Sequence, residues 1–383
     1  MNREISYGEV LAAIQRLKKG KAPGEDQLVT DMIIKSGENM KLAIHKLFEQ
    51  SWKDSKIPEK WKIAKVQFLK KTGKKSYHKA SSYRPISLTS SVGNCLEKII
   101  EARLYVFSEH HKLLDNEKEG FRHFKGTTGA LIRLSQDIYT GFIEGLHTVG
   151  IFIDLEKAFD TVWREGLLTK LHRMGITGQI WHWLRDFLTG RKAFCMLKHA
   201  QGNIFQTSLG LPQGSVLSPT LFNLFLSDIF ENVKNQKVKF ADDGTIWKTG
   251  KDIATITRSL EEDMAEIQSW IKKWRMKVNL NKTEFCVFSR ATQILEGDVS
   301  LTVSNIHLRR SSNPKLLGVV LDEKLQFTQH IRYVQKRALK SLNALLKMGK
   351  TEKISPANMV KNIPVSCYPS VRVCDTYLAD CRL

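Results

Sequence analysis

Two adjacent aspartates, Asp242 and Asp243, lie inside the otherwise β-like run KFADDGTIW. Consecutive residues of a regular strand point to opposite faces of its sheet, so the two carboxylates cannot both serve one face. The dipeptide Asp-Gly between two such runs is a strong hairpin signal. The segment therefore predicts a hairpin with both aspartates at or beside its turn, and the two like charges there need a physical reason.

Length and charge limit the classes of protein to which the chain can belong. Its 383 residues allow two or three domains, and 42% hydrophobic residues allow a buried core. Lys and Arg total 60 against 39 Asp and Glu, a formal net charge of +21. Such an excess favours nucleic acid as the partner, although charge alone also fits an anionic membrane or no specific partner.

Membrane association and disulfide scaffolding are not expected. No apolar run reaches the roughly 18 residues of a spanning helix, and the charged start lacks an apolar signal region. We therefore expect no membrane partner and no signal peptide, with an intracellular location in the nucleus or cytoplasm. Cys95, Cys195 and Cys286 are expected to be buried thiols. The three cysteines of the tail are Cys367, Cys374 and Cys381. They lack the Cys-x-x-Cys pair and the nearby His that are typical of a zinc site.

Capping signals and periodicity predict the order of the elements. Ser6 and Glu9 form a predicted capping box at the start of a helix, which ends before a basic Gly-Pro loop over 18–24. Residues 61–91 are typical of a strand, a long basic loop and a second strand, and a helix over roughly 93–107 follows. A buried strand is expected to end near Asp154, and Asp160 is expected to begin the next helix.

The second half of the chain continues this mixed pattern. A helix after the predicted hairpin carries one apolar face, made by Leu260, Met264, Ile267, Ile271 and Trp274. A strand over 284–289 follows that helix. The order predicts an α+β fold, with helices packed on an antiparallel sheet.

Asp154, Asp242 and Asp243 are the candidate metal ligands. Only the fold can bring Asp154 to the other two, because it lies far from them in the sequence. Three carboxylates without His or Cys suit Mg²⁺ or Mn²⁺ rather than zinc. Two such ions about 3.5–4 Å apart stabilise the attacking and leaving oxygens of phosphoryl transfer. The alternative is a plain polar turn, which the dipeptide by itself would favour.

A series of motifs in one order extends this hypothesis. The segments are LKKGKAPGEDQL, YRPISLTSS, FIDLEKAFDTV, LPQGSVLSPTLFNLFL, KFADDGTIW, KVNLNKTEF and PKLLGVVLDEKLQFTQHI. The series resembles the successive motifs of reverse transcriptases, specifically those of non-LTR (LINE-type, jockey-like) retrotransposons, over residues 5–345. The resemblance implies a right-hand polymerase fold with fingers and palm largely complete and a partial thumb.

The resemblance also implies roles for residues at the metal site. Asp154, Asp242 and Asp243 would hold two Mg²⁺ ions in the palm, with Mn²⁺ as a possible substitute. Asp160 is interpreted as a helix cap rather than a ligand, because it lies past the end of the strand. Lys282 matches a lysine that protonates the pyrophosphate leaving group, and an exposed lysine without a role is the alternative.

Further residues match positions that contact the nucleotide. Phe159 matches the bulky residue that excludes a ribose 2′-hydroxyl, with an ordinary core Phe as the alternative. Gln213 and Gly214 match the loop that touches the incoming nucleotide and the template base, although Pro and Gly would also make a plain turn. Phe240 stands where many relatives have Tyr. Arg84 matches an arginine that grips the triphosphate.

Lys70 and Lys71 are weaker candidates for the same contact, because lysine runs are usually solvated surface.

Four regions are expected, namely an N-terminal lead-in over 1–50, the fingers and palm over 51–322, the start of a basic thumb over 323–350, and an atypical tail over 351–383. The tail departs from the thumb pattern, so a truncated or partial copy is expected.

The implied function is RNA-directed DNA polymerase, a nucleotidyltransferase acting with an RNA template, a DNA primer, the RNA–DNA duplex and dNTPs. A remnant that binds nucleic acid without polymerising is the alternative from a different class. The intact aspartates favour the enzyme, whereas the tail favours the remnant. An interaction protein built on a decayed palm is a third reading, which the three retained carboxylates disfavour.

Overall fold

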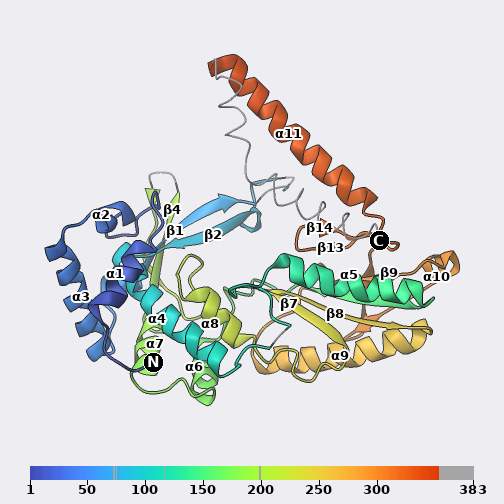
Figure 1. The fold of residues 1–383 in the computed structure, drawn as a ribbon, viewed down its shortest axis with the longest axis horizontal. Coiled ribbons are helices and arrows are strands. Elements are labelled where there is room, and N and C mark those ends of the chain that lie inside the picture. The colour runs from blue at the N-terminus through green and yellow to red at the C-terminus, as the bar shows by residue number, and fades with distance from the viewer. Residues whose placement is uncertain (72–73, 75, 116, 198–199, 353–383) are drawn as a thin grey trace. The chain divides into compact units, whose positions relative to one another are not determined.

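The computed structural model describes residues 1–352 except 72–73, 75, 116 and 198–199 (Figure 1). The chain forms two compact units, each assembled from segments that are far apart in the sequence. The first unit combines Met1–Phe121, Leu155–Glu231 and Ser269–Lys277, and the second combines Arg122–Asp154, Asn232–Gln268 and the chain from Val278 onward. The catalytic candidates are therefore divided between two units, which are described separately.

The sheet of the first unit is built around β1 (Ile63–Lys70). It pairs antiparallel with β2 (Tyr83–Leu88) and parallel with β4 (Lys192–Leu197). The short strands β5 (Ala200–Gln201) and β6 (Phe205–Gln206) pair with β4. Alternate residues of β1 are buried, as its apolar residues at every second position predict. The expected order of strand, basic loop and strand over 61–91 is confirmed.

Seven α-helices accompany this sheet in the described part of the first unit, and α1 packs against α3 and α4. They are α1 (Tyr7–Gln15), α2 (Thr30–Ile34), α3 (Glu38–Lys53), α4 (Ser91–His110), α6 (Arg164–Arg173), α7 (Gln179–Leu188) and α8 (Ser218–Phe225). Two 3₁₀ turns, Glu59–Lys62 and Ala80–Ser82, lie before β1 and β2. The capping box of α1 is confirmed, because the Ser6 hydroxyl accepts from the Glu9 amide while the Ser6 amide donates to the Glu9 carboxylate. The helix expected over 93–107 is α4, which is longer at both ends.

The sheet of the second unit has the strand order β12-β9-β3-β8-β7. These strands are β3 (His147–Ile153), β7 (Gln236–Phe240), β8 (Asp243–Gly250), β9 (Glu284–Phe288) and β12 (Arg309–Arg310). All neighbours are antiparallel except β12 and β9. Six of the seven residues of β3 are buried, which explains its unbroken apolar run, because this central strand is covered on both faces.

Helices cover both faces of this second sheet. In Figure 1, α5 (Thr127–Ile143) lies along one face, and residues 253–268 of α9 (Ile253–Lys273) lie along the other. Leu134 and Ile138 of α5 pack with Trp247 and Phe288 in one buried cluster. The apolar face predicted for α9 is confirmed, since Leu260, Met264, Ile267, Ile271 and Trp274 are all buried.

Small elements complete the second unit. They are α10 (Thr292–Glu296), β10 (Thr302–Val303), β11 (Ile306–His307), β13 (Lys315–Leu316), β14 (Val319–Val320) and α11 (Thr328–Glu352). The basic helix expected at the start of the thumb corresponds to α11. The tail from 353 onward, with its three cysteines, lies outside the described residues. No helix in the described part of the chain is both long enough and apolar enough to cross a membrane.

Two expectations are corrected by the fold. Cys195 is only half-buried on β4, whereas Cys95 and Cys286 are buried as expected. The helix expected to begin at Asp160 begins at Arg164 instead, with Trp163 at its N-cap position. The carbonyls of Phe159 and Val162 accept from the amides of Leu211 and Gly210, so they are not available to the first turn of a helix.

Candidate active site

The hairpin between β7 and β8 presents the paired aspartates. Phe240 pairs with Asp243, so Ala241 and Asp242 form the two-residue turn, and Ala241 has a φ of 53° in the left-handed region. The predicted hairpin with both aspartates at or beside its turn is confirmed, although the Asp-Gly dipeptide begins β8 and does not itself form the turn. Gly244 lies within the ladder because β8 pairs with β3 up to Ile153 and Gly244. Pairing on both sides of β8 therefore fixes the position of the turn.

The same pairing brings Asp154 to the hairpin. Asp154 directly follows Ile153, so the β3–β8 register places it across from Asp243 at the same end of two neighbouring strands. Its amide donates to the Thr283 hydroxyl at 3.2 Å, and its carbonyl accepts from the Asn279 amide at 2.8 Å. The segment after α9 thus holds the backbone of Asp154 at both its amide and its carbonyl.

Lys282 contacts the Asp154 carboxylate. Its Nζ donates to the two carboxylate oxygens at 3.0 and 3.3 Å, although 65% of the lysine side chain is exposed. Lys282 is thus exposed and paired with Asp154, and its role as a proton donor stays a prediction. An amine that reaches this carboxylate lies within the cluster of carboxylates, which is the position a proton donor to the leaving group would need.

The three aspartates influence one another electrostatically. The pKa of Asp243 is raised to about 6, by desolvation among neighbouring protein atoms and then by the negative charges of Asp242 and Asp154, while Lys282 opposes the rise. The Asp243 side chain is nonetheless solvent-accessible. We therefore attribute the functional meaning to the repulsion, which requires the three carboxylates to be close. A cation among them would relieve that repulsion.

The donor chemistry of these residues fits a hard divalent cation. Carboxylate oxygens are the ligands that Mg²⁺ and Mn²⁺ prefer, and the three aspartates supply them without a soft ligand. Within the part of the chain that the structure describes, no three His, Cys, Asp or Glu side chains are already gathered as a metal site. Asp154 is instead engaged by Lys282. The Asp154 carboxylate retains acceptor positions for a cation beside its hydrogen bonds from Lys282.

In the first unit, the loop Leu209–Leu217 carries Gln213 and Gly214. The Gln213 side-chain amide donates to the Asp160 carboxylate at 2.8 Å, and the Gln213 backbone carbonyl accepts from the Ser87 amide at 2.7 Å. Gly214 has a φ of 132°, and a Cβ there would lie 2.4 Å from the Ser87 carbonyl oxygen. Glycine is thus required at this position both by conformation and by the close approach to β2. A plain turn would not need that contact.

Arg164 holds one arm of this loop, and the sequence did not reveal it. Its guanidinium donates to the carbonyls of Thr207, Leu209 and Gly210 at 2.6, 2.9 and 2.8 Å. The side chain is buried, and burial followed by the positive charge of Arg191 lowers its pKa to about 10. A buried guanidinium saturated by carbonyls is a structural clamp rather than a phosphate ligand.

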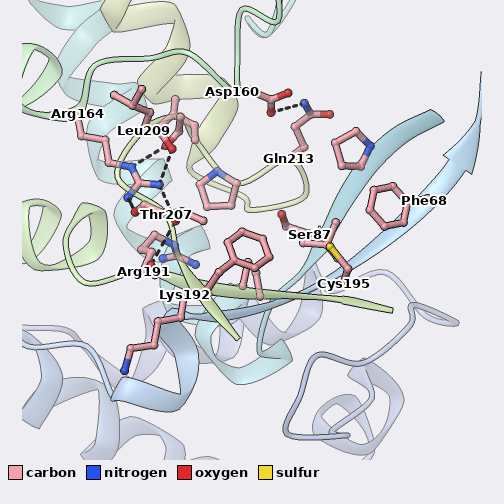
Figure 2. Close-up of a pocket in the computed structure, with 18 residues that line it drawn as sticks. Phe68, Ser87, Asp160, Arg164, Arg191, Lys192, Cys195, Thr207, Leu209 and Gln213 are labelled. Atoms are coloured by element: carbon pink, nitrogen blue, oxygen red, sulfur yellow. Dashed lines mark hydrogen bonds between the residues drawn. The ribbon is translucent and has the colours of Figure 1, made fainter. Parts of the chain in front are cut away.

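Figure 2 shows the cavity of about 310 Å³ that borders this loop. Phe68, Ser87 and Cys195 lie on one side, Arg164, Thr207 and Arg191 lie on the other, and the Asp160–Gln213 hydrogen bond lies at its edge. The cavity is lined by residues from Leu209 to Gln213, although Leu211 is buried and Gly210 lies against the backbone of Asp160. Hydrogen bonds hold the loop along its length, since the amides of Gly210 and Leu211 donate to the carbonyls of Val162 and Phe159.

Phe159 is half-buried in the first unit. Its ring stacks on that of Phe222, with centroids 4.2 Å apart and planes 20° apart, and it meets the edge of Phe121 at 6.3 Å. One face is thus supported by the core while part of the ring remains accessible. This arrangement is compatible both with a steric gate and with ordinary packing, so the gate remains a prediction.

The basic residues expected at the triphosphate differ in their engagement. Arg84 is exposed on β2 opposite Leu69, and its guanidinium makes no hydrogen bond or ion pair to the residues that the structure describes. Lys71 donates to the Ser81 carbonyl at 3.1 Å, and Lys70 lies 5.1 Å from the Tyr77 ring centroid. Arg84 is consequently the most available cation of the three.

Comparison with known proteins adds independent findings. The family described as Reverse transcriptase (RNA-dependent DNA polymerase) matches residues 69–321. The RNA-directed DNA polymerase from mobile element jockey of Drosophila melanogaster is 30% identical over 339 residues, which cover 86% of this chain and 36% of the relative. The probable RNA-directed DNA polymerase from transposon BS of the same organism is 26% identical over 351 residues, which cover 90% of this chain and 38% of the relative.

Among solved structures, apo telomerase from Candida Tropicalis truncated from its C-terminal domain covers 70% of this chain and 54% of that chain, with a TM-score of 0.48 and 11% identity. The chain spans 36% to 39% of the length of the jockey and BS relatives. The expected α+β class and right-hand polymerase fold are confirmed, and so is the resemblance to jockey-like elements. Since the family matches well over half of its length, this chain belongs to the reverse transcriptase (RNA-dependent DNA polymerase) family.

Proposed function

We propose that this chain is an RNA-directed DNA polymerase that copies retrotransposon RNA by adding dNTPs to a primer 3′-hydroxyl. The observation that carries the proposal is the position of Asp154 across from Asp243 at the end of two neighbouring strands, beside the Asp242 turn. The family membership supplies the reaction class, and the whole protein's activity is inferred from it.

In this reaction the primer 3′-oxygen forms a bond to the α-phosphorus of the dNTP, and the bond from that phosphorus to the pyrophosphate oxygen breaks. The family implies dependence on divalent metal. Asp154, Asp242 and Asp243 would hold two ions, which we propose are Mg²⁺ with Mn²⁺ as a substitute. When bound, such ions stabilise the attacking and leaving oxygens. Lys282 would donate a proton to the departing pyrophosphate once it has left the Asp154 carboxylate.

The residues of the first unit and the hairpin would select and orient the nucleotide. Arg84 would grip the triphosphate through its guanidinium fork. Gln213 and Gly214 would contact the nucleotide and the template base, and Phe159 would exclude a 2′-hydroxyl. Phe240, paired with Asp243 at the end of β7, would support the hairpin beneath the primer end.

The partners follow from the reaction. They are an RNA template, a DNA primer, their hybrid duplex and dNTPs. The polymerase reaction would take place in the nucleus or cytoplasm. We propose four regions along the chain: an N-terminal lead-in over 1–50, the fingers and palm over 51–322, the start of the thumb over 323–350, and the tail over 351–383.

A remnant that binds nucleic acid without polymerising is the second candidate, favoured by a tail that does not match a thumb. Primer extension on an RNA template with Mg²⁺ separates the two. We expect dNTP incorporation that requires both the RNA template and the divalent cation. Template binding by folded protein without any incorporation would instead establish the remnant.

A further inference from the structure

A buried carboxylate lies behind the loop that carries Gln213 and Gly214. Glu97 is on α4 with 5% of its surface exposed, and burial raises the pKa of its carboxyl. Burying such a group is unfavourable unless hydrogen bonds replace the lost water. The partners of Glu97 therefore indicate what the residue serves.

All three hydrogen bonds to Glu97 come from one short segment. The Ser215 hydroxyl donates to Oε2 at 2.5 Å, and the amides of Val216 and Leu217 donate to the same oxygen at 2.9 and 3.2 Å. This segment joins Gly214 to the first turn of α8. One oxygen thus satisfies three donors that would otherwise be buried without a partner.

The opposite arm of the loop is held by a different helix. Arg164 of α6 binds the carbonyls of Thr207, Leu209 and Gly210. Between the two arms, the tip touches β2 through the hydrogen bond from Ser87 to the Gln213 carbonyl. The Pro212 carbonyl also accepts from the Ser218 hydroxyl at 2.9 Å, and a cavity borders this part of the loop. Releasing the arm that Glu97 holds should loosen Gln213, because only Gly214 separates Gln213 from Ser215.

We propose that Glu97 is a positioning residue, which fixes Ser215–Leu217 and through them sets the affinity of the Gln213–Gly214 tip for the incoming nucleotide. This inference rests on the proposed function, in which the tip contacts the nucleotide. Glu97 itself touches no reacting atom. It acts by keeping the second arm of the loop in one conformation.

Amide hydrogen exchange tests the first half of the proposal without requiring activity. Glu97→Met keeps the volume of the side chain and removes the acceptor, so the Val216 and Leu217 amides should exchange at least about tenfold faster. Glu97→Gln retains an acceptor oxygen and should restore slow exchange. Glu101→Met is the matched control, because Glu101 lies one turn further along α4 and accepts from Thr220 of α8 instead. Unchanged exchange in Glu97→Met would overturn the proposal.

Steady-state kinetics tests the second half. Glu97→Met should raise the KM for dNTP by about tenfold with a smaller effect on kcat, and Glu97→Gln should reverse most of the increase. In a Gln213→Ala background the same substitution should change KM by less than about twofold, because the residue through which it acts is gone. A KM effect of equal size in both backgrounds would overturn the inference and leave Glu97 as a general stabiliser.

Two further outcomes are decisive. If Glu97→Met does not fold, Glu97→Asp replaces it, since the shorter side chain withdraws the carboxylate while keeping its charge. If exchange is faster in Glu97→Met as predicted but the wild type incorporates no dNTP, the proposed function fails, and the role of Glu97 in nucleotide affinity fails with it. If the wild type is active and exchange is faster in Glu97→Met, an unchanged KM for dNTP in that variant rejects this inference alone.

Discussion

Phe159 is supported by the core on one face, because its ring stacks on that of Phe222, which is fully buried. A ring held in this way has few alternative rotamers, so a group that enters its space meets a clash. The same contact predicts a packing loss when the ring is removed. Selectivity and stability therefore give separate measurements of its role.

We expect Phe159→Val to raise the ratio of rNTP to dNTP incorporation efficiency, with a modest loss on dNTPs. The gate predicts this because the space for a 2′-hydroxyl opens while all three aspartates stay. The cavity left behind should lower stability by up to about 3 kcal/mol. Phe68→Val, at a half-buried strand position in the same unit, is the matched control and should leave the ratio unchanged. An unchanged ratio with a lowered melting temperature would identify Phe159 as a packing residue only.

Single residues of the site were predictable where they stood in recognisable patterns. Asp154, Asp242 and Asp243 belonged to motifs with a chemical reason for carboxylates. Thr283 was missed although it stands in the quoted segment KVNLNKTEF, since its partner lies far along the chain. Glu97 has no distinctive local signal, because its helix also carries Glu101 one turn further along and the buried Arg103.

At the scale of elements, local signals placed helices and strands well and turns less well. The Asp-Gly dipeptide lies at the start of β8 rather than in the turn, and α6 begins at Arg164 rather than at Asp160. In each case backbone groups are paired with strands or loops far along the chain. Capping and periodicity cannot report such pairings, which explains why α1, with its local capping box, was placed correctly.

The capping residue Glu9 of α1 gives a pH prediction. Burial alone would raise the pKa of its carboxyl, but hydrogen bonds from Arg103 and the Ser6 backbone, with the charge of Arg103, lower it to about 2. A depressed pKa contributes stability above the ordinary value near 4.5, and that contribution is lost as the pH falls toward about 2.

Glu9→Gln should therefore melt at a lower temperature than wild type at pH 7, with a stability loss of about 1–3 kcal/mol. The gap should shrink between pH 4.5 and pH 2, and thermal melts across that range measure it. A gap that stays constant with pH would show that the Glu9–Arg103 pair makes no ionic contribution.

At the scale of the whole molecule, the net charge of +21 predicts sequence-independent binding to nucleic acid. Basic residues are concentrated in segments 18–21, 62–79 and 332–350 of the sequence. Lys62 does not contribute, because it is buried and paired with Asp186. Arg332, Lys336 and Lys340 are exposed at helical spacing on α11 and form a basic stripe.

The affinity for an RNA–DNA duplex should fall linearly on a plot of log affinity against log salt. Replacing Arg332, Lys336 and Lys340 by Gln should reduce the magnitude of the slope by about three, one unit for each lost phosphate contact. A slope that is flat in the wild type would contradict binding through phosphates. A slope unchanged in the triple variant would exclude α11 from the contact.

The order of motifs along the chain predicted the fold class, because each motif belongs to one element of a polymerase palm or fingers. The sequence could not predict the division into two compact units, which combines segments from both halves of the chain. That division arises from long-range strand pairing, such as that of β3 with β8 and β9.

The most direct test of the account compares primer extension by wild type, Asp242→Asn and Asp252→Asn on an RNA template with Mg²⁺. Asp252 is an exposed aspartate that caps α9, so its substitution is a matched change outside the carboxylate cluster. We predict dNTP incorporation by wild type and Asp252→Asn, and a loss of at least about a thousandfold in Asp242→Asn with unchanged template binding. Equal incorporation by both variants would contradict the assignment of the catalytic aspartates.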